Sequence, residues 1–297
     1  MTMRTRRWSR RRFLGAAGAA GVLVACGDDE APTPVDDLDG PGPMTTERLD
    51  YGAHEDQVGD LWLPAGLVDP VPVVVLIHGG FWLQQFDLGL MDPLAESLAR
   101  AGYAAWNIEY RRVGGAGGYP QTFDDVAAAV DHLAVLDDDR LDVARVAVVG
   151  HSAGGHLAAW VASRGALPDD APWADPAVRP VVAFPQAGVL DLVACAENRV
   201  GGTACPDLLR GTPAQEPEHY ALTSPIELLP IGVPVIAVHG DDDGNVPLAQ
   251  SETYVDRAVA AGDPAELVVV DGADHFDVID PAHESWTAIL DRLPDHL

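Results

Sequence analysis

The sequence contains no lysine, so all 18 of its basic residues are arginines. Against them stand 46 aspartates and glutamates, which give a formal net charge of −28 at pH 7. A surface this acidic repels nucleic acid and anionic lipid head groups, so neither is expected as a partner. The acidic surplus indicates either a saline habitat or a bias in genomic base composition, and the sequence does not separate the two.

The N-terminal region lacks an apolar run long enough to cross a membrane comfortably as a helix. Its small and apolar stretch, residues 15–25, is too short for that purpose. Residues 9–14 precede it and read Ser-Arg-Arg-Arg-Phe-Leu, which is a twin-arginine pattern. Residues 1–25 are therefore predicted to be a twin-arginine export signal.

Cysteine is scarce, with three in the whole chain. Cys26 ends the sequence Leu-Val-Ala-Cys, which resembles a bacterial lipoprotein box, where the cysteine becomes lipidated and begins the mature chain. The alternative is a cleaved signal followed by a spare thiol. Cys195 and Cys205 lie close together in the sequence, and in an exported protein such a pair is predicted to form a disulfide. Two free thiols are the alternative.

The chain divides into a leader, a tether and one domain. Residues 26–44 are rich in Pro, Asp and Gly and too poor in apolar residues to fold, which predicts a disordered tether. Residues 45–297 are enough to bury a single large α/β core. These features predict an exported lipoprotein held by its lipid anchor alone on the outer face of the cytoplasmic membrane. A periplasmic or secreted protein is the alternative.

Apolar strand-like runs alternate with amphipathic helix-like segments through most of the domain. Two short alternating segments at 48–51 and 58–63 predict an antiparallel hairpin at its start. Further strands are predicted at 73–77, 104–110, 146–149, 181–184, 233–239 and 266–270, and helices at 91–101, 123–136, 156–162, 248–261 and 283–293. This alternation predicts a mostly parallel central sheet with helices on both faces. Residues 191–231 interrupt it without a strong period, which indicates either a lid or a surface excursion.

Two motifs follow predicted strands and carry the chemistry. Residues 150–154 read Gly-His-Ser-Ala-Gly between a strand and a helix, which is the arrangement of a nucleophile elbow. The outer glycines allow strand and helix to pass closely, while Ser152 is held in a strained conformation that points its hydroxyl outward. Residues 78–82, His-Gly-Gly-Phe-Trp, follow the strand at 73–77, where an oxyanion loop belongs.

A serine nucleophile needs a base within hydrogen-bond reach, and the base needs an orienting acid. Two later loops follow strands and supply candidates at the carboxyl edge of the sheet. Residues 272–276 contain His275, which is the predicted base, and residues 239–247 contain three consecutive aspartates, Asp241, Asp242 and Asp243.

Together these ordered motifs resemble the α/β-hydrolase superfamily, and more narrowly the esterases and arylformamidases with a His-Gly-Gly-x-Trp oxyanion motif and a Gly-x-Ser-Ala-Gly-Gly elbow. The likeness runs from about residue 51 to the C-terminus. It implies an α/β-hydrolase fold with Ser152 as nucleophile and His275 as base. The family pattern His-Gly-x-x-Asp-x-x-Val-Pro, laid onto residues 239–247, selects Asp243 as the acid.

The resemblance also implies oxyanion donors and a substrate pocket. The donors are the backbone N–H groups of Gly80, Phe81 and Ala153, with Phe81 standing where many relatives have a third glycine. Trp82 and His151 are predicted to line the pocket, His151 at a variable and exposed position of the elbow. Among the other residues near these motifs, His78 is expected to brace the oxyanion loop, and His156 and His239 are expected to be structural. Three residues that end a strand, Glu109, Tyr110 and Arg111, either help to build the site or only pair charges.

The predicted function is a serine hydrolase that cleaves small or aryl carboxylic esters through an acyl-enzyme, with no cofactor and a small-molecule substrate as partner. An arylformamidase is the alternative within the class, and a non-catalytic surface-binding lipoprotein on a hydrolase scaffold is the alternative outside it. Residues 241–252 mimic a calcium loop, but Val246 stands where that loop needs glycine, so no metal site is predicted. The oligomeric state is left open.

Overall fold

The computed structural model describes residues 44–297. The predicted export signal at 1–25, the lipidation at Cys26 and the tether up to residue 43 lie outside the described residues. Within the part of the chain that is described, no helix combines the length and the apolar character needed to cross a bilayer.

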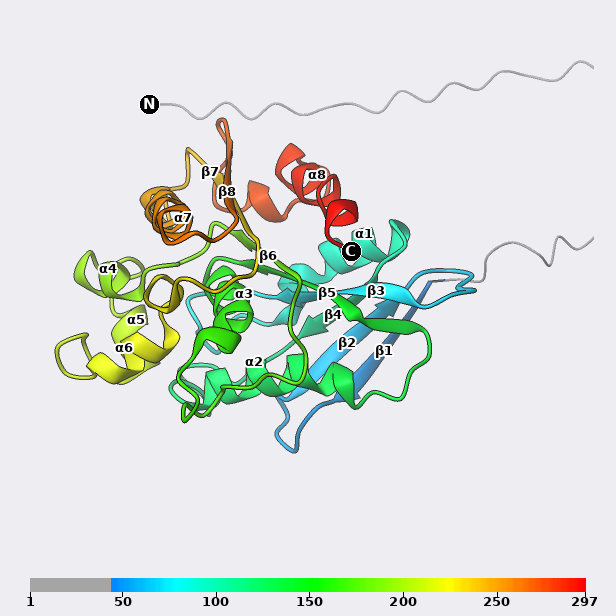
Figure 1. The fold of residues 1–297 in the computed structure, drawn as a ribbon, viewed down its shortest axis with the longest axis horizontal. Helices are drawn as coiled ribbons and strands as arrows, with labels where there is room; N and C mark the ends of the chain where they lie inside the picture. Colours follow the sequence, from blue (N-terminus) through cyan, green and yellow to red (C-terminus); the bar gives the residue numbers. More distant parts are fainter. Residues whose placement is uncertain (1–43) are drawn as a thin grey trace, which may run out of the picture. The chain divides into compact units, whose positions relative to one another are not determined.

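A single eight-stranded sheet forms the centre of the domain, in the order β1-β2-β4-β3-β5-β6-β7-β8 (Figure 1). The strands are β1 (Thr45–Asp50), β2 (Val58–Leu63), β3 (Val71–Ile77), β4 (Ala104–Ile108), β5 (Leu141–His151), β6 (Val182–Gln186), β7 (Val235–Gly240) and β8 (Ala265–Val270). The hairpin of β1 and β2 is antiparallel, and β2 also pairs antiparallel with β4. All other pairings are parallel, which confirms the predicted mostly parallel sheet.

Helices cover both faces of this sheet, as the alternation of strands and helices predicts. They are α1 (Asp92–Arg100), α2 (Gln121–Asp131), α3 (Ala153–Ser163), α4 (Leu192–Glu197), α5 (Ala204–Leu209), α6 (Pro217–Thr223), α7 (Ala249–Ala261) and α8 (Glu284–Leu290). The side chains of β3 alternate between two cores: Val73 and Val75 join α2 and α3, whereas Val74 and Leu76 join α1 and α8. Because both faces are buried, β3 is apolar nearly throughout.

Two features of the fold differ from the sequence-based expectation. Strand β5 begins at Leu141 rather than at 146, because its first residues lie partly exposed and carry polar side chains that hide the strand pattern. Residues 191–231 contain three short helices, α4, α5 and α6, which group together beside α3 in Figure 1. Helices of six or seven residues are too short to show a helical period in the sequence.

The carboxyl ends of four parallel strands bring the predicted motifs to one edge of the sheet. The loop at 78–82 follows β3, and Ser152 follows β5 directly. The acid loop follows β7 and the loop with His275 follows β8. In open α/β sheets this edge is where ligands bind.

Candidate active site

Ser152 occupies the turn between β5 and α3 in a conformation that few residues other than glycine adopt. Its backbone angles are φ 56° and ψ −115°, and such a conformation costs a non-glycine residue about 1–3 kcal/mol. A Cβ on Gly150 would collide with the backbone of Gly154, and a Cβ on Gly154 would collide with the backbone of Ile77. Both flanking glycines are therefore required for the strand and the helix to pass at this distance.

His275 and Asp243 are in direct contact. His275 Nδ1 lies 2.7 Å from Asp243 Oδ2, and their side chains are only 6% and 1% exposed. The other carboxylate oxygen of Asp243 accepts hydrogen bonds of 2.8 Å from the N–H groups of Asn245 and Val246. This fixes the carboxylate and leaves Nε2 of the His275 ring as the nitrogen not used by the acid.

The charge state of Asp243 follows from its partners. Burial acts to raise its pKa, but hydrogen bonds from His239, His275 and the Val246 amide outweigh burial and hold the pKa well below its usual value. His239 Nε2 lies 3.3 Å from Asp243 Oδ2, so the histidine expected to be structural also supports the acid. Asp241 and Asp242 are exposed, and Asp241 instead accepts a hydrogen bond from the Gly272 amide.

The elbow and the His275 loop are tied together by His151, the residue before the serine. Its Nε2 lies 2.8 Å from the backbone oxygen of His275, and the two rings are 4.6 Å apart. Among the described residues, the hydrogen bonds do not include one between the Ser152 hydroxyl and the His275 ring. In unliganded enzymes such bonds are often long and shorten when substrate binds. The structure thus joins Asp243 to His275 and holds the loops of His275 and Ser152 together.

The oxyanion loop runs beside the nucleophile. A Cβ on Gly79 would lie 2.8 Å from the backbone oxygen of His151 and 3.1 Å from the Cβ of Ser152, so a side chain here would push the loop away from the elbow. Gly80, Phe81 and Trp82 follow with φ of 107°, 53° and 57°, three successive residues in the left-handed region. Ala153, the other predicted donor, is the first residue of α3, where backbone N–H groups have no partner within the helix and the helix dipole favours negative charge.

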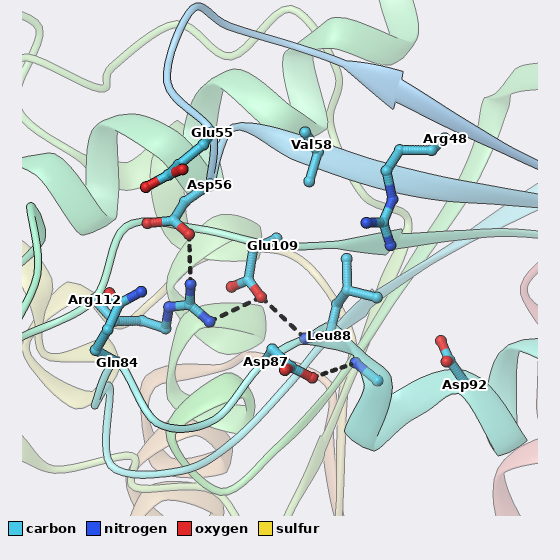
Figure 2. A pocket seen from close by; sticks show the side chains of 11 residues that line it. Arg48, Glu55, Asp56, Val58, Gln84, Asp87, Leu88, Asp92, Glu109 and Arg112 are labelled. Atoms are coloured by element: carbon cyan, nitrogen blue, oxygen red, sulfur yellow. Dashed lines mark hydrogen bonds and ion pairs between the residues drawn. The ribbon is translucent and has the colours of Figure 1, made fainter.

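A network of charged side chains is joined to the oxyanion loop through His78, and Figure 2 shows three of its members, Asp56, Glu109 and Arg112. His78 Nε2 lies 2.8 Å from Glu109 Oε1, and its Nδ1 lies 2.8 Å from the backbone oxygen of Gly79. Glu109 Oε2 pairs with Arg112 at 2.8 Å, and Arg112 pairs with Asp56 at 2.6 Å. Asp56, Glu109 and Arg112 line a cavity of about 430 Å³ that also reaches Arg48 and Asp92.

The sequence left open whether Glu109 builds the site or only pairs charges. Glu109 pairs with Arg112, but it also binds His78, which is continuous with the oxyanion loop, so it contributes to the structure of the site. Tyr110 adds a hydrogen bond of 2.9 Å to the His78 backbone oxygen and stacks on its ring. Sequence reasoning missed Arg112 and Asp56. The charged residues that end the apolar run of β4 were the available signal, but their partners come from distant segments.

The expectation that His151 is exposed is wrong, because only 2% of the residue is accessible. Trp82 is fully buried as well, and its ring makes an edge contact with His156 at 5.3 Å. His156 donates from Nε2 to the Thr223 backbone oxygen, and burial lowers its pKa to about 4. His156 therefore has the packing role expected for it.

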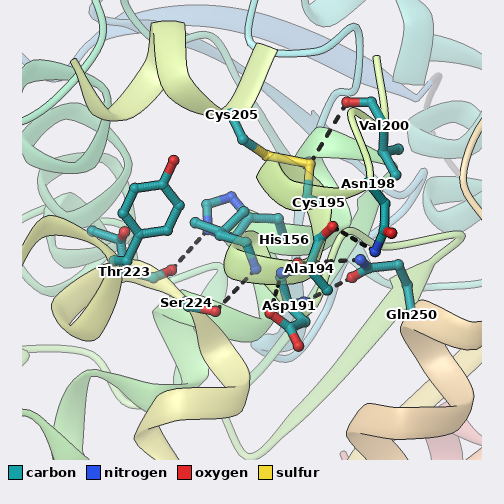
Figure 3. Close-up of a disulfide and its surroundings, with 12 residues drawn as sticks. His156, Asp191, Ala194, Cys195, Asn198, Val200, Cys205, Thr223, Ser224 and Gln250 are labelled. Atoms are coloured by element: carbon teal, nitrogen blue, oxygen red, sulfur yellow. Dashed lines mark hydrogen bonds between the residues drawn. A yellow bond between two sulfur atoms is a disulfide. The ribbon is translucent and has the colours of Figure 1, made fainter. Parts of the chain in front are cut away.

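The segment 191–231 lies against the oxyanion loop. Cys195 in α4 and Cys205 in α5 form a disulfide, which closes the loop between the two helices (Figure 3). A Cβ on Gly201 in that loop would collide with the Phe81 ring. Ser152 is 1% exposed in this arrangement. The contact between Phe81 and the disulfide loop therefore forms part of the wall around the site.

The described residues contain no cluster of three or more His, Cys, Asp or Glu side chains positioned to hold a metal ion. In the segment that mimics a calcium loop, Asp243 is bound to His275 instead.

Comparison with known proteins gives relatives named as ester hydrolases and as kynurenine formamidases. A carboxylic ester hydrolase of Mycobacterium tuberculosis named LipM, described as probable, is 27% identical over 84% of this chain and 62% of its own length. The kynurenine formamidase of Salmo salar is 25% identical over 80% of this chain and 76% of its own length. The chain thus spans less than two thirds of the length of LipM.

Solved structures share the fold. A truncated carbohydrate esterase from gut microbiota superposes with a TM-score of 0.74 at 21% identity, covering 87% of this chain and 98% of that chain. A thermophilic esterase from Thermogutta terrifontis, with propionate bound, gives 0.67 at 22% identity, covering 84% and 92%. These likenesses, with the sheet described above, confirm the α/β-hydrolase fold.

The BD-FAE family model matches residues 60–257, which is more than half of the chain and includes the oxyanion loop, the elbow and the acid loop. The chain belongs to the BD-FAE family, within the esterase and arylformamidase-like group of α/β-hydrolases.

Proposed function

We propose that the protein is a serine hydrolase that cleaves carboxylic esters through an acyl-enzyme intermediate. The observation that carries the proposal is the 2.7 Å contact between His275 and Asp243, held by His151 against the loop of the strained Ser152. Neighbouring esterases with the same fold and curated relatives named as ester hydrolases support it.

In the first half-reaction, His275 Nε2 takes the proton from the Ser152 hydroxyl as the oxygen attacks the ester carbonyl. The negative charge on the tetrahedral intermediate is met by the N–H groups of Gly80, Phe81 and Ala153. When the intermediate collapses, the bond to the leaving alcohol breaks, and His275 gives that alcohol its proton. The acyl group remains on Ser152.

In the second half-reaction, a water molecule repeats the chemistry. His275 takes a proton from the water, whose oxygen attacks the acyl-enzyme, and then returns a proton to the Ser152 oxygen as the carboxylic acid leaves. Asp243 stays ionised throughout, holds the ring through Nδ1 and stabilises its positive charge. The route uses no cofactor.

The substrates proposed are small or aryl esters. Phe81 places an aromatic ring between the oxyanion loop and the disulfide loop, which restricts the space beside the serine and favours a compact or flat group. An arylformamidase is the second candidate, because the kynurenine formamidase of Salmo salar matches over most of both chains. Its formyl amide requires the same groups.

We also propose that the protein is exported and held by lipid at Cys26, as the N-terminal motifs predict. The disulfide between Cys195 and Cys205 supports an oxidising compartment, because such bonds persist outside the cytoplasm. Metabolic labelling with a fatty acid, compared between the native chain and Cys26→Ala, tests the anchor.

The test of function is turnover of p-nitrophenyl acetate and N-formylkynurenine, measured side by side. An esterase hydrolyses the first far faster, and an arylformamidase the second. Ser152→Ala must abolish either activity while the protein remains folded by circular dichroism. A folded native protein that turns over neither compound, nor other small esters, would favour a non-catalytic binding protein.

A further inference from the structure

We propose that His151 is a positioning residue for the base: its buried ring donates a hydrogen bond from Nε2 to the backbone oxygen of His275 and so fixes the approach of His275 to Ser152. This inference rests on the proposed function, because it takes His275 as the base. It assigns a role to His151, an elbow residue that is not part of the triad.

The His151 ring lies where three loops of the site meet. It belongs to the last residue of β5, one peptide bond before the nucleophile. On one side, Nε2 lies 2.8 Å from the His275 backbone oxygen. On the other, a Cβ on Gly79 would lie 2.9 Å from Nδ1, so the ring packs closely against the oxyanion loop. Movement of this ring therefore affects the base and the oxyanion loop together.

The hydrogen-bond chemistry fixes which nitrogen carries the proton. A backbone oxygen only accepts, so Nε2 must donate, and a neutral ring then has its lone pair on Nδ1. Nδ1 is buried and has no hydrogen-bond partner among the described residues. The arrangement is that of a neutral ring with a single donor, used on His275.

Neutrality is also what the reaction requires. Burial, followed by repulsion from the His275 ring, lowers the pKa of His151 to about 3, and the charge of His239 acts in the same direction, whereas the contact with the His275 backbone and the charge of Asp243 act against it. His275 becomes positively charged in each half-reaction, and a second charge on a ring 4.6 Å away would oppose that step.

The first residues of the His275 loop are tied to the acid loop, because the Asp242 N–H donates to the Ala273 oxygen at 3.2 Å and the Gly272 N–H to Asp241 Oδ1 at 2.7 Å. Around His275, Asp274 accepts hydrogen bonds from the N–H groups of Phe276 and Asp277. The backbone oxygen of His275 itself is bound by the His151 ring. Phe276, the residue after the base, is 57% exposed and anchors little. Asp243 holds the His275 side chain, and His151 holds its backbone. The two contacts together fix both position and orientation of the ring.

A pair of variants separates the hydrogen bond from the packing of the ring. In His151→Gln the amide nitrogen of the side chain reaches about as far as Nε2 of histidine, so it can still donate to the His275 oxygen. In His151→Asn the amide reaches only about as far as Nδ1 and leaves that oxygen without a donor. Because a misplaced catalytic group costs up to about 100-fold, we expect His151→Asn to lose about 10- to 100-fold in kcat with little change in KM. We expect His151→Gln to recover most of that loss.

Two outcomes of this comparison overturn the proposal. Equal losses in folded Gln and Asn variants would assign the effect to ring packing, and native kcat in both would show that the contact does not matter. Failure of the proposed function looks different, because the native protein would then lack turnover or Ser152→Ala would retain it. Thermal unfolding of each variant establishes that it is folded.

A measurement on the unaltered chain decides the matter if the variants fail to fold. Nitrogen-15 NMR of the histidine rings at pH 7 is expected to show His151 neutral, protonated at Nε2 and unprotonated at Nδ1. A ring protonated at Nδ1 alone would face the His275 oxygen with a lone pair and overturn the proposal.

Discussion

Replacing Glu109 by glutamine tests the support of the oxyanion loop most severely. The Glu109 carboxylate accepts hydrogen bonds of 2.8 to 3.1 Å from His78 Nε2 and the Tyr110 amide on one oxygen and from the Leu88 amide on the other, and that second oxygen also forms an ion pair with Arg112 at 2.8 Å. Glutamine keeps the shape but turns one accepting oxygen into a donor, so at least one of these donors then faces another donor.

The magnitude follows from the burial of Arg112, whose side chain is 4% exposed. Removing one partner of a buried ion pair costs about 3–5 kcal/mol, because the other charge remains buried. Asp56 still pairs with Arg112 at 2.6 Å, so the lower end applies. We therefore expect Glu109→Gln to lower the free energy of unfolding by about 3 kcal/mol.

Glu109→Gln should also lower kcat, because Glu109 binds His78 and His78 is continuous with the oxyanion loop. Oxyanion contacts are strongest in the transition state, so their displacement lowers kcat rather than raising KM. We expect kcat to fall about 10- to 100-fold, since full removal of one such donor costs about 100- to 1,000-fold.

Urea denaturation and steady-state ester hydrolysis measure the two effects. Glu96→Gln is the matched control, because the pair of Glu96 with Arg100 has side chains 43% and 71% exposed. An exposed pair contributes about 0.5 kcal/mol or less, and the control should keep native kcat. Equal losses of stability in the two variants, or native kcat in a folded Glu109→Gln protein, would refute the reasoning.

Three further predictions follow from the site. Asp243→Asn should lower kcat by about 10⁴-fold in ester hydrolysis assays, as expected for a base held in the wrong tautomer, whereas Asp242→Asn should not; retained activity in Asp243→Asn would remove it from the triad. The pKa of Asp243 is depressed in the folded state, so its stabilising contribution is present above about pH 4, the ordinary carboxyl range, and disappears as pH falls through the folded value. Acid unfolding curves should therefore show a smaller loss of stability below pH about 4 in Asp243→Asn than in the native chain, and parallel curves would contradict this. Gly201→Ala and Gly202→Ala both place alanine at positive φ, but only Gly201→Ala collides with Phe81. Gly202→Ala should lower the free energy of unfolding in urea by about 1 kcal/mol, and Gly201→Ala by more because of the collision. Only Gly201→Ala should change kcat/KM, and equal kcat/KM values in the two variants would show that the disulfide loop does not affect the site.

Much of the site could be predicted because its signals are local. The glycines around Ser152 are required by contacts with the neighbouring turn and strand, so the elbow can be recognised from five adjacent residues. The apolar run of β3 and the motif that follows it are equally local. Identifying Asp243 as the acid required more than the local sequence, because three aspartates are adjacent and only the family pattern distinguishes between them. The structure places the other two at the surface.

The parts that could not be predicted depend on segments far apart in the chain. The network of His78, Glu109, Arg112 and Asp56 forms only when β4, the oxyanion loop and the turn after β1 meet. His151 was expected at the surface because it occupies the variable position of the elbow, but the His275 loop, which comes more than a hundred residues later, covers it. No local sequence pattern indicates that these distant loops come together.

The central claim is that Ser152 is the nucleophile and that His275 is the base that activates it. Its most direct test is the site of reaction with a small organophosphate, mapped by mass spectrometry of the intact chain and of its peptides. The account predicts one adduct per chain, located on Ser152 and formed at a rate that drops sharply in His275→Ala. A folded protein that acquires no adduct, or carries it on another residue, would contradict the claim.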